Sequence, residues 1–206
     1  MIISDNPFLI RQSTATQIEN PTPSEWIFEV GENGFLAADF LQTDTDLRVR
    51  VYLSGAQAEC SINCGYLVNN NNKIKIDIQV IHKSKNTTSN QQIRGLVADA
   101  GSVDFTGTIT IPYDSQKCDG RQNHRAVLLS DKATVSATPQ LEIWADDVKC
   151  AHGSAVGPLD PNQLFYLQTR GLSESEAKKL LLSSFFSDLM PAEFNPLIAD
   201  WMAHHV

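Results

Sequence analysis

The residues of this sequence best suited to chemistry are a cysteine and a histidine near residue 150. Cys150 and His152 are separated by a single alanine. A thiolate and an imidazole together can ligate zinc or iron, or act as nucleophile and base. A structural zinc site, however, needs four ligands and usually a second close pair of them. A buried strand cysteine beside a surface or interface histidine is therefore the simpler interpretation.

Other polar groups of the sequence are better explained by structure than by chemistry. Cys60 and Cys64 have the spacing C-x-x-x-C, which places both thiols on one face of a strand and favours a pair of core cysteines over a metal site. Asp146 and Asp147 are adjacent, so on a strand they would not converge as glycosidase carboxylates do. We interpret these aspartates as part of a turn or a surface ion pair. His124 precedes the apolar run AVLL and is expected to be a surface or half-buried strand residue.

Composition and motifs disfavour several classes of function. The 206 residues carry a formal net charge of -8, with a pI of about 5.0, whereas nucleic-acid binding needs clustered Lys and Arg. No apolar run approaches the length of a membrane helix, and the N-terminus lacks a signal-peptide pattern. We therefore expect a cytoplasmic protein with reduced thiols. The sequence has no phosphate-binding glycine loop, so we predict that the chain is not an ATPase on its own. It also has no Gly-x-Ser-x-Gly and no His-Glu-x-x-His, and we expect a protein that is not an enzyme.

Most of the chain shows the pattern of β-strands. Apolar and polar residues alternate strictly at residues 47–53, 73–80 and 104–111, which puts one face of each strand in a core and the other in water. Clear strands begin roughly 20–30 residues apart. This spacing fits a stacked coil with two or three short strands in each turn, and it fits a β-sandwich as well.

Helical signals replace this alternation after residue 153. Asp160 and Pro161 predict an N-cap and a first helical residue, and Gly171 predicts the end of that helix. The run SESE at residues 173–176 predicts a capping box at the start of a second helix. The apolar stripe expected on this second helix consists of Ala177, Leu180, Leu181, Ser184 and Phe185.

These patterns divide the chain into three parts. Residues 1–24 are polar and contain two prolines near their end, which predicts a flexible N-terminal arm. Residues 25–155 form the β core, and residues 156–206 form the helical domain.

A series of short, distinctive strings lies in one order between residues 87 and 171. The most specific is ADDVKC at residues 145–150, followed by HG at 152–153 and LFYL at 164–167. The others are TTSNQ at 87–91, SQKCD at 115–119, LLS at 128–130, PQLEI at 139–143 and RG at 170–171. Together they resemble the SufB/SufD family of iron–sulfur cluster assembly scaffolds, and in particular its SufD members.

The resemblance implies a mainly β protein, a right-handed parallel β-helix followed by a small C-terminal α-helical domain. It implies a subunit of the SUF complex that pairs with a SufB-like subunit and docks the SufC ATPase. Such a subunit supports nascent cluster assembly and iron acquisition. We expect no cofactor to be bound stably by the chain alone, and only a transient iron–sulfur cluster or iron in the complex.

The resemblance also carries over to individual residues. His152 falls on the histidine of the C-x-HG motif, which implies a ligand for the cluster or for iron at the subunit interface. In SufB the cluster-binding cysteine lies 28 residues before this histidine, and the same interval here reaches His124, a second metal-ligand candidate. The residues expected to bind the partner ATPase are Leu164, Phe165, Tyr166, Arg170, Leu181 and Phe185.

The alternative function is that of a homodimeric β-helix protein with a binding or structural role and no direct role in cluster assembly. The isolated chain is expected to form a homodimer through its last strands. Complete SufD chains have an N-terminal helical region and a longer β-helix, for which this chain has little room. A short β-helix exposes the edge of its first turn, and the arm at residues 1–24 could cover that edge.

Overall fold

The computed structural model describes residues 8–14, 16–17 and 25–206. The rest of the expected N-terminal arm lies outside the described residues. Within the arm, β1 (Phe8–Ser13) pairs antiparallel with β4 (Phe35–Gln42), and β2 (Thr16–Gln17) pairs antiparallel with β3 (Glu25–Val30). These two strands cover the first edges of both sheets.

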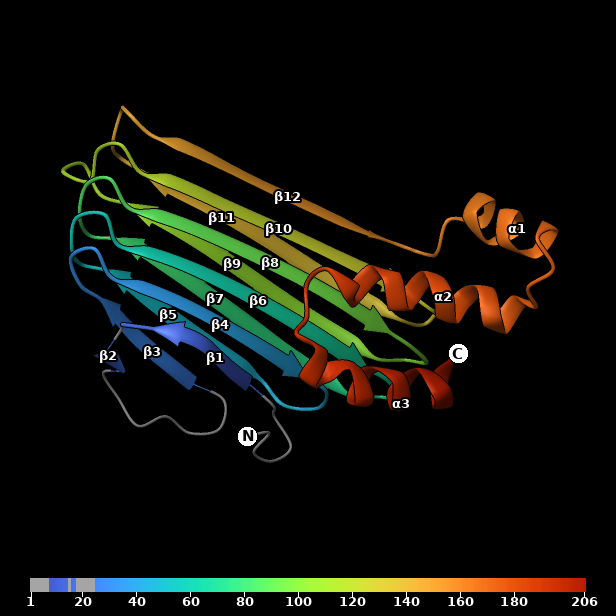
Figure 1. The fold of residues 1–206 in the computed structure, drawn as a ribbon. Coiled ribbons are helices and arrows are strands. Elements are labelled where there is room, and N and C mark those ends of the chain that lie inside the picture. Colours follow the sequence, from blue (N-terminus) through green and yellow to red (C-terminus); the bar gives the residue numbers. More distant parts are fainter. Residues whose placement is uncertain (1–7, 15, 18–24) are drawn as a thin grey trace.

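The core is a coil in which each turn gives one strand to each of two sheets (Figure 1). Sheet A has the order β1-β4-β6-β8-β10-β12, and sheet B has the order β11-β9-β7-β5-β3-β2. The remaining strands are β5 (Leu47–Leu53), β6 (Glu59–Val68), β7 (Lys73–His82), β8 (Thr88–Val97), β9 (Ser102–Ile111), β10 (Asp119–Leu128), β11 (Thr134–Ile143) and β12 (Lys149–Gly157). From β3 to β12, neighbouring strands within each sheet run parallel. The predicted parallel β-helix is thus confirmed, and the sandwich is excluded.

The hydrophobic core fills the space between the two sheets. In sheet B every second residue points inward, as Ile76 and Ile78 of β7 do at 1% and 0% exposure. The register stacks these inward residues on those of the next turn, for example Ile76 on Phe105. The alternation read from the sequence therefore becomes continuous apolar rows that run through successive turns.

Three α-helices and one short 3-10 helix follow the last strand. They are α1 (Pro161–Thr169), α2 (Glu174–Ser187), η1 (Ala192–Phe194) and α3 (Asn195–His205). The predicted caps are confirmed, because the Asp160 carboxylate accepts from the Asn162 N–H and Ser173 forms a capping box with Glu176. Gly171 follows α1 with a φ of +96°, the left-handed conformation expected of a glycine at that place.

Helices α2 and α3 cover part of the outer face of sheet A (Figure 1). The second helix buries Ala177, Leu182 and Phe186, whereas the expected stripe contained Leu180, which is 49% exposed. The expected stripe is therefore correct only in part, because Leu181 and Phe185 are half-buried whereas Leu180 and Ser184 are exposed. Leu182 and Phe186 of α2 pack against apolar residues on the outer face of sheet A, among them Leu67.

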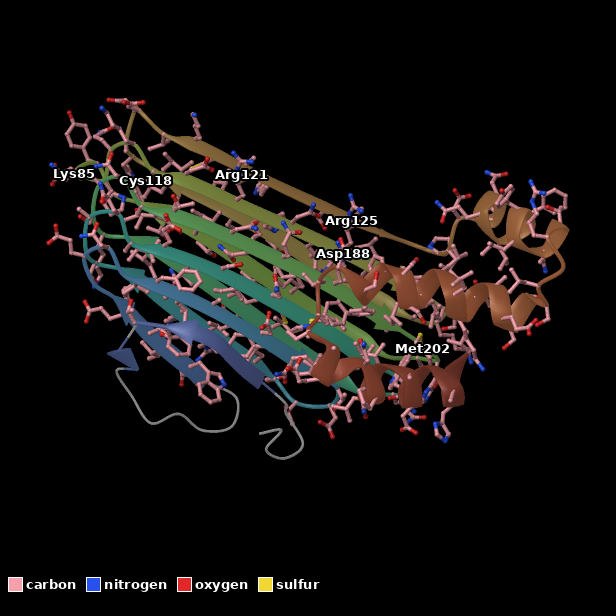
Figure 2. The ribbon with its side chains drawn as sticks, viewed as in Figure 1. Lys85, Cys118, Arg121, Arg125, Asp188 and Met202 are labelled. Atoms are coloured by element: carbon pink, nitrogen blue, oxygen red, sulfur yellow. The ribbon has the colours of Figure 1, made fainter. Side chains whose placement is uncertain are left out.

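One arginine attaches the helical domain to the sheet. Arg94 of β8 donates to the Phe185 carbonyl and to both carboxylate oxygens of Asp188, the longer of these two contacts being 3.0 Å from Nη2 to Oδ2. Its guanidinium also lies 5.5 Å from the centre of the Phe185 ring. The hydrogen bond from Arg94 lowers the pKa of Asp188, and the nearby charge of Arg125 acts in the same direction (Figure 2).

None of the helices in the described part of the chain is both long and apolar enough to cross a membrane.

Candidate functional site

The two ends of the β-helix differ in how their strand edges are covered. The first turn is covered by β1 and β2, whereas β11 and β12 each pair on one side only among the described strands. We call the turn made of β11 and β12 the open coil; it forms the far edge of both sheets in Figure 1. Its unpaired backbone N–H and C=O groups can accept a further strand on each sheet.

The interior of the β-helix reaches the surface at the open coil. On β9 the inward residues Val103, Phe105 and Ile109 are at most 1% exposed. The residues that continue these rows on β11 are only half-buried: Val135, Ala137, Pro139, Leu141 and Ile143. A hydrophobic core that ends half-exposed would gain free energy if another surface covered it.

The β12 side of the open coil carries polar groups. Gln122 and His124 of β10 point inward and are 3% and 0% exposed. Their register partners on β12 are His152 and Ser154. Paired residues of neighbouring strands project to the same face, so these two side chains belong to the inward row. Both are exposed, because β12 ends its sheet.

His152, the candidate ligand, therefore lies on the surface of the open coil beside Gln122. No group of three or more His, Cys, Asp or Glu side chains that could hold a metal occurs in the described part of the chain. A metal or cluster at His152 would need further ligands from outside the described residues.

His124, the second metal-ligand candidate, is buried and fully hydrogen-bonded. Its ring stacks on Phe105 with centroids 4.6 Å apart and on Tyr66 at 6.0 Å. Nε2 lies 2.9 Å from the Tyr66 hydroxyl, and Nδ1 lies 3.1 Å from Ser154 Oγ. Burial lowers the pKa of His124 to about 4. The expected surface or half-buried position is thus wrong, and to bind a metal His124 would have to break one of these bonds.

The interior next to His124 also contains a hydrogen bond between two buried glutamines. Gln122 Nε2 donates to Gln91 Oε1 at 2.9 Å. The amide of Gln122 lies against Gly107, where an added Cβ would come within 2.3 Å of Nε2. This neighbour of His152 is therefore held in one position by its packing.

The cysteines are structural. Cys60 and Cys64 lie in the main core as predicted, and burial raises the pKa of each thiol to about 12. Cys118 is 1% exposed, and its sulfur lies 3.1 Å from Thr87 Oγ1. It lies at the end of the coil far from the helices (Figure 2). Cys150 is half-buried, and burial raises its pKa as well. The raised pKa values of Cys60, Cys64 and Cys150 mean that these three thiols form little thiolate and have low reactivity.

The adjacent aspartates lie in a turn, as predicted. Asp146 and Asp147 belong to the connection between β11 and β12 and are exposed. The backbone N–H of Asp147 donates to Gln116 Oε1 at 2.9 Å.

The residues expected to bind a partner ATPase fall into two groups. Helix α1 has no buried residue; it exposes 68% of Phe165 and 57% of Tyr166, with Arg170 5.1 Å from the Tyr166 ring. Leu164 shares this helix and is half-buried. On α2, Leu181 and Phe185 are also half-buried.

Of these, Phe185 already has structural contacts. Its ring meets Phe186 edge-on at 5.4 Å and faces Arg94. Helix α1, which lies beyond the ends of the sheets in Figure 1, is thus the more available surface.

Sequence reasoning missed Ser154 and Tyr66. Neither stands in a recognisable motif, and Tyr66 reads as an ordinary aromatic strand residue. Ser154 lies beside His124 because β12 pairs with β10 in parallel register. Tyr66 reaches His124 across β8, which lies between β6 and β10 and places Gly95 against the Tyr66 ring.

The sequence of this chain matches a family model and several curated proteins. The family model described as "SUF system FeS cluster assembly, SufBD core domain" matches residues 36–185. The iron–sulfur cluster assembly protein SufD of Escherichia coli is 37% identical over 111 residues, 54% of this chain and 26% of that protein. SufD of Bacillus subtilis is 35% identical over 112 residues, with the same two shares of 54% and 26%. The chloroplastic protein ABCI7 of Arabidopsis thaliana is 32% identical over 159 residues, 77% of this chain and 34% of that protein.

The fold defines a class of protein, a parallel β-helix with a C-terminal helical module on one sheet. Because the family model matches well over half of the chain, this protein belongs to the SufBD core family of the SUF system. The predicted family is thereby confirmed. The chain spans about a quarter to a third of the length of these curated relatives.

Proposed function

We propose that this chain is a non-enzymatic subunit of a SUF-type iron–sulfur cluster assembly complex and pairs through its open coil with a SufB-like subunit. The observation that carries the proposal is the open coil itself. Two unpaired strand edges flank a half-exposed apolar row, while the opposite end of the β-helix is covered by β1 and β2. Family membership supports a partner with a similar β-helix.

In this complex His152 acts as a transient ligand for iron or for a nascent cluster, which is cargo rather than a resident cofactor. Neutral imidazole is a competent ligand for iron. The exposed ring lies in the surface that pairs, so the partner can supply the remaining ligands. No such set exists within the described residues of this chain.

Pairing is tested by placing a charge inside the open coil. Leu141 points inward on β11, and its neighbour Gln140 points outward. We expect Leu141→Glu to weaken binding of a purified SufB-like subunit at least tenfold, because the carboxylate would be desolvated at the interface. Gln140→Glu should bind like the unmodified chain. Isothermal calorimetry measures both affinities, and circular dichroism checks that each variant is folded.

Equal binding by the Leu141 and Gln140 variants would contradict pairing through the open coil. A stable dimer of this chain that excludes the SufB-like subunit, seen by light scattering, would favour the homodimeric alternative. In the reconstituted complex, His152→Ala should lower the yield of cluster absorbance. An unchanged yield would leave His152 without a ligand role.

We further propose that α1 docks a SufC-like ATPase. Replacing Phe165 and Tyr166 together with alanine should weaken ATPase binding at least tenfold, since exposed aromatic residues commonly dominate interface energies. The matched control is the double variant Gln163→Ala and Gln168→Ala, which changes exposed polar residues of the same helix. A pull-down titration compares the two, and equal binding would reject α1 as the docking element.

A further inference from the structure

A buried chain of hydrogen bonds leads from the core to the open coil. It runs from the Tyr66 hydroxyl to His124 Nε2, and from His124 Nδ1 to Ser154 Oγ. Tyr66 and His124 are both 0% exposed, whereas Ser154 is exposed on the inward row of β12. The Tyr66 end of this series of hydrogen bonds is therefore fixed in the core, and the Ser154 end lies at the surface.

The burial of Tyr66 determines the direction of these bonds. Its hydroxyl carries one proton, and His124 is its hydrogen-bond partner in the described part of the chain. Leaving that proton unpaired in the core would be costly. Burial raises the pKa of Tyr66, so the hydroxyl stays protonated. Tyr66 therefore donates to Nε2.

The proton of the His124 ring must then be on Nδ1. A neutral imidazole has one N–H and one acceptor nitrogen, and the lowered pKa of His124 keeps its ring neutral at pH 7. With Nε2 accepting from Tyr66, Nδ1–H donates to Ser154 Oγ. Because Ser154 accepts this bond, its own hydroxyl proton is directed away from His124.

We propose that Ser154 is a hydrogen-bond donor through which the open coil recognises an oxygen acceptor, a carbonyl or carboxylate, on the facing strand of the partner subunit. Tyr66 and His124 act as positioning residues that orient this donor. Ser154 lies two positions beyond His152 on the same row of β12. The proposal rests on pairing through the open coil, but the buried chain can be tested without a partner.

The first experiment uses the isolated chain. Two-bond ¹H–¹⁵N correlation NMR at pH 7 should show His124 with its proton on Nδ1. Tyr66→Phe keeps the aromatic ring and removes the donor to Nε2, so the population of that tautomer should fall. A His124 proton on Nε2 in the unmodified protein would contradict the proposed direction of the buried hydrogen bonds. So would an unchanged tautomer in Tyr66→Phe.

The second experiment measures pairing. Ser154→Ala should raise the Kd for the SufB-like subunit about tenfold, the effect of losing one buried donor. The control is Ser136→Ala, an exposed serine on the outward face of β11, which should change the Kd less than about twofold. An unchanged Kd for Ser154→Ala would overturn the donor role.

The outcomes separate this inference from the proposed function. If the unmodified chain fails to pair, the proposed function and the docking role of Ser154 fall together. If the unmodified chain pairs and Ser154→Ala leaves the Kd unchanged, pairing through the open coil is retained and the donor role of Ser154 is rejected. The tautomer of His124 tests the buried hydrogen bonds from Tyr66 to Ser154 whether or not the protein pairs with a partner.

Discussion

Replacing Gly95 with alanine is expected to lower the free energy of unfolding by about 3 kcal/mol. A Cβ at this position would lie 1.8 Å from Tyr66 Cε2 and 1.9 Å from Cζ, far inside van der Waals contact. The Tyr66 ring has little room to move, because it is fully buried and its hydroxyl is bonded to His124. The substitution therefore combines overpacking with the loss of a buried hydrogen bond.

Gly153→Ala is the matched control for this prediction. Gly153 also lies in a strand of sheet A, yet an added Cβ would meet nothing within 4 Å. Urea unfolding should give this variant the stability of the unmodified chain to within about 0.5 kcal/mol. Equal stability of the Gly95 and Gly153 variants would show that Tyr66 can move, which would weaken the case for a fixed chain to Ser154.

Acidification from pH 7 to pH 4 is expected to remove about 3 kcal/mol of stability for each of two buried histidines. Burial lowers the pKa of both His82 and His124 from 6.5 to about 4. His82 is 0% exposed, and its two ring nitrogens lie 2.7 Å from Thr87 Oγ1 and 2.9 Å from Ser89 Oγ. Neither ring can be protonated in the fold without losing an accepted hydrogen bond.

The direction of the effect follows from which state binds the proton first. The unfolded chain binds it near pH 6.5, whereas the folded chain does so only near pH 4. Stability is therefore full above pH 6.5 and falls as the pH drops toward 4. Urea unfolding at half-unit steps of pH measures the slope. His124→Gln and His82→Gln should each remove about 3 kcal/mol of the loss between pH 7 and pH 4, and the lowered pKa of Asp188 adds a further loss of the same sign as the pH falls. A flat profile would contradict the buried neutral state.

Much of the fold could be predicted from local patterns. Alternation located the strands because each side of a strand faces either the core or the outside of the coil, as β7 shows. The caps at Asp160 and Ser173 were predictable because a cap is made by residues within the same turn of chain. Pattern alone left the coil and the sandwich equally open, and the motif strings around ADDVKC decided between them.

The candidate site could be predicted less well. His152 was found through its motif, and its place on the open coil agrees with an interface role. The environment of His124 was missed because the run QNHR contains no apolar residue to signal a buried face. Gln122 and His124 point inward because the strand alternation of β10 places them there, and polar partners in the interior satisfy them. The face that α2 buries was misjudged for a related reason, since sheet A determines it and not the helix sequence.

The sequence by itself determined the β-helix, its helical tail, the family and the position of His152, because these depend on local periodicity, capping and short motifs. Only the tertiary structure decided that the last turn is open and that Tyr66, His124 and Ser154 form one chain. The physical reason is the stacking of turns, which brings residues 66, 124 and 154 together across β6, β8, β10 and β12. Spacing along the sequence contains no signal for such contacts until the register between the turns is known.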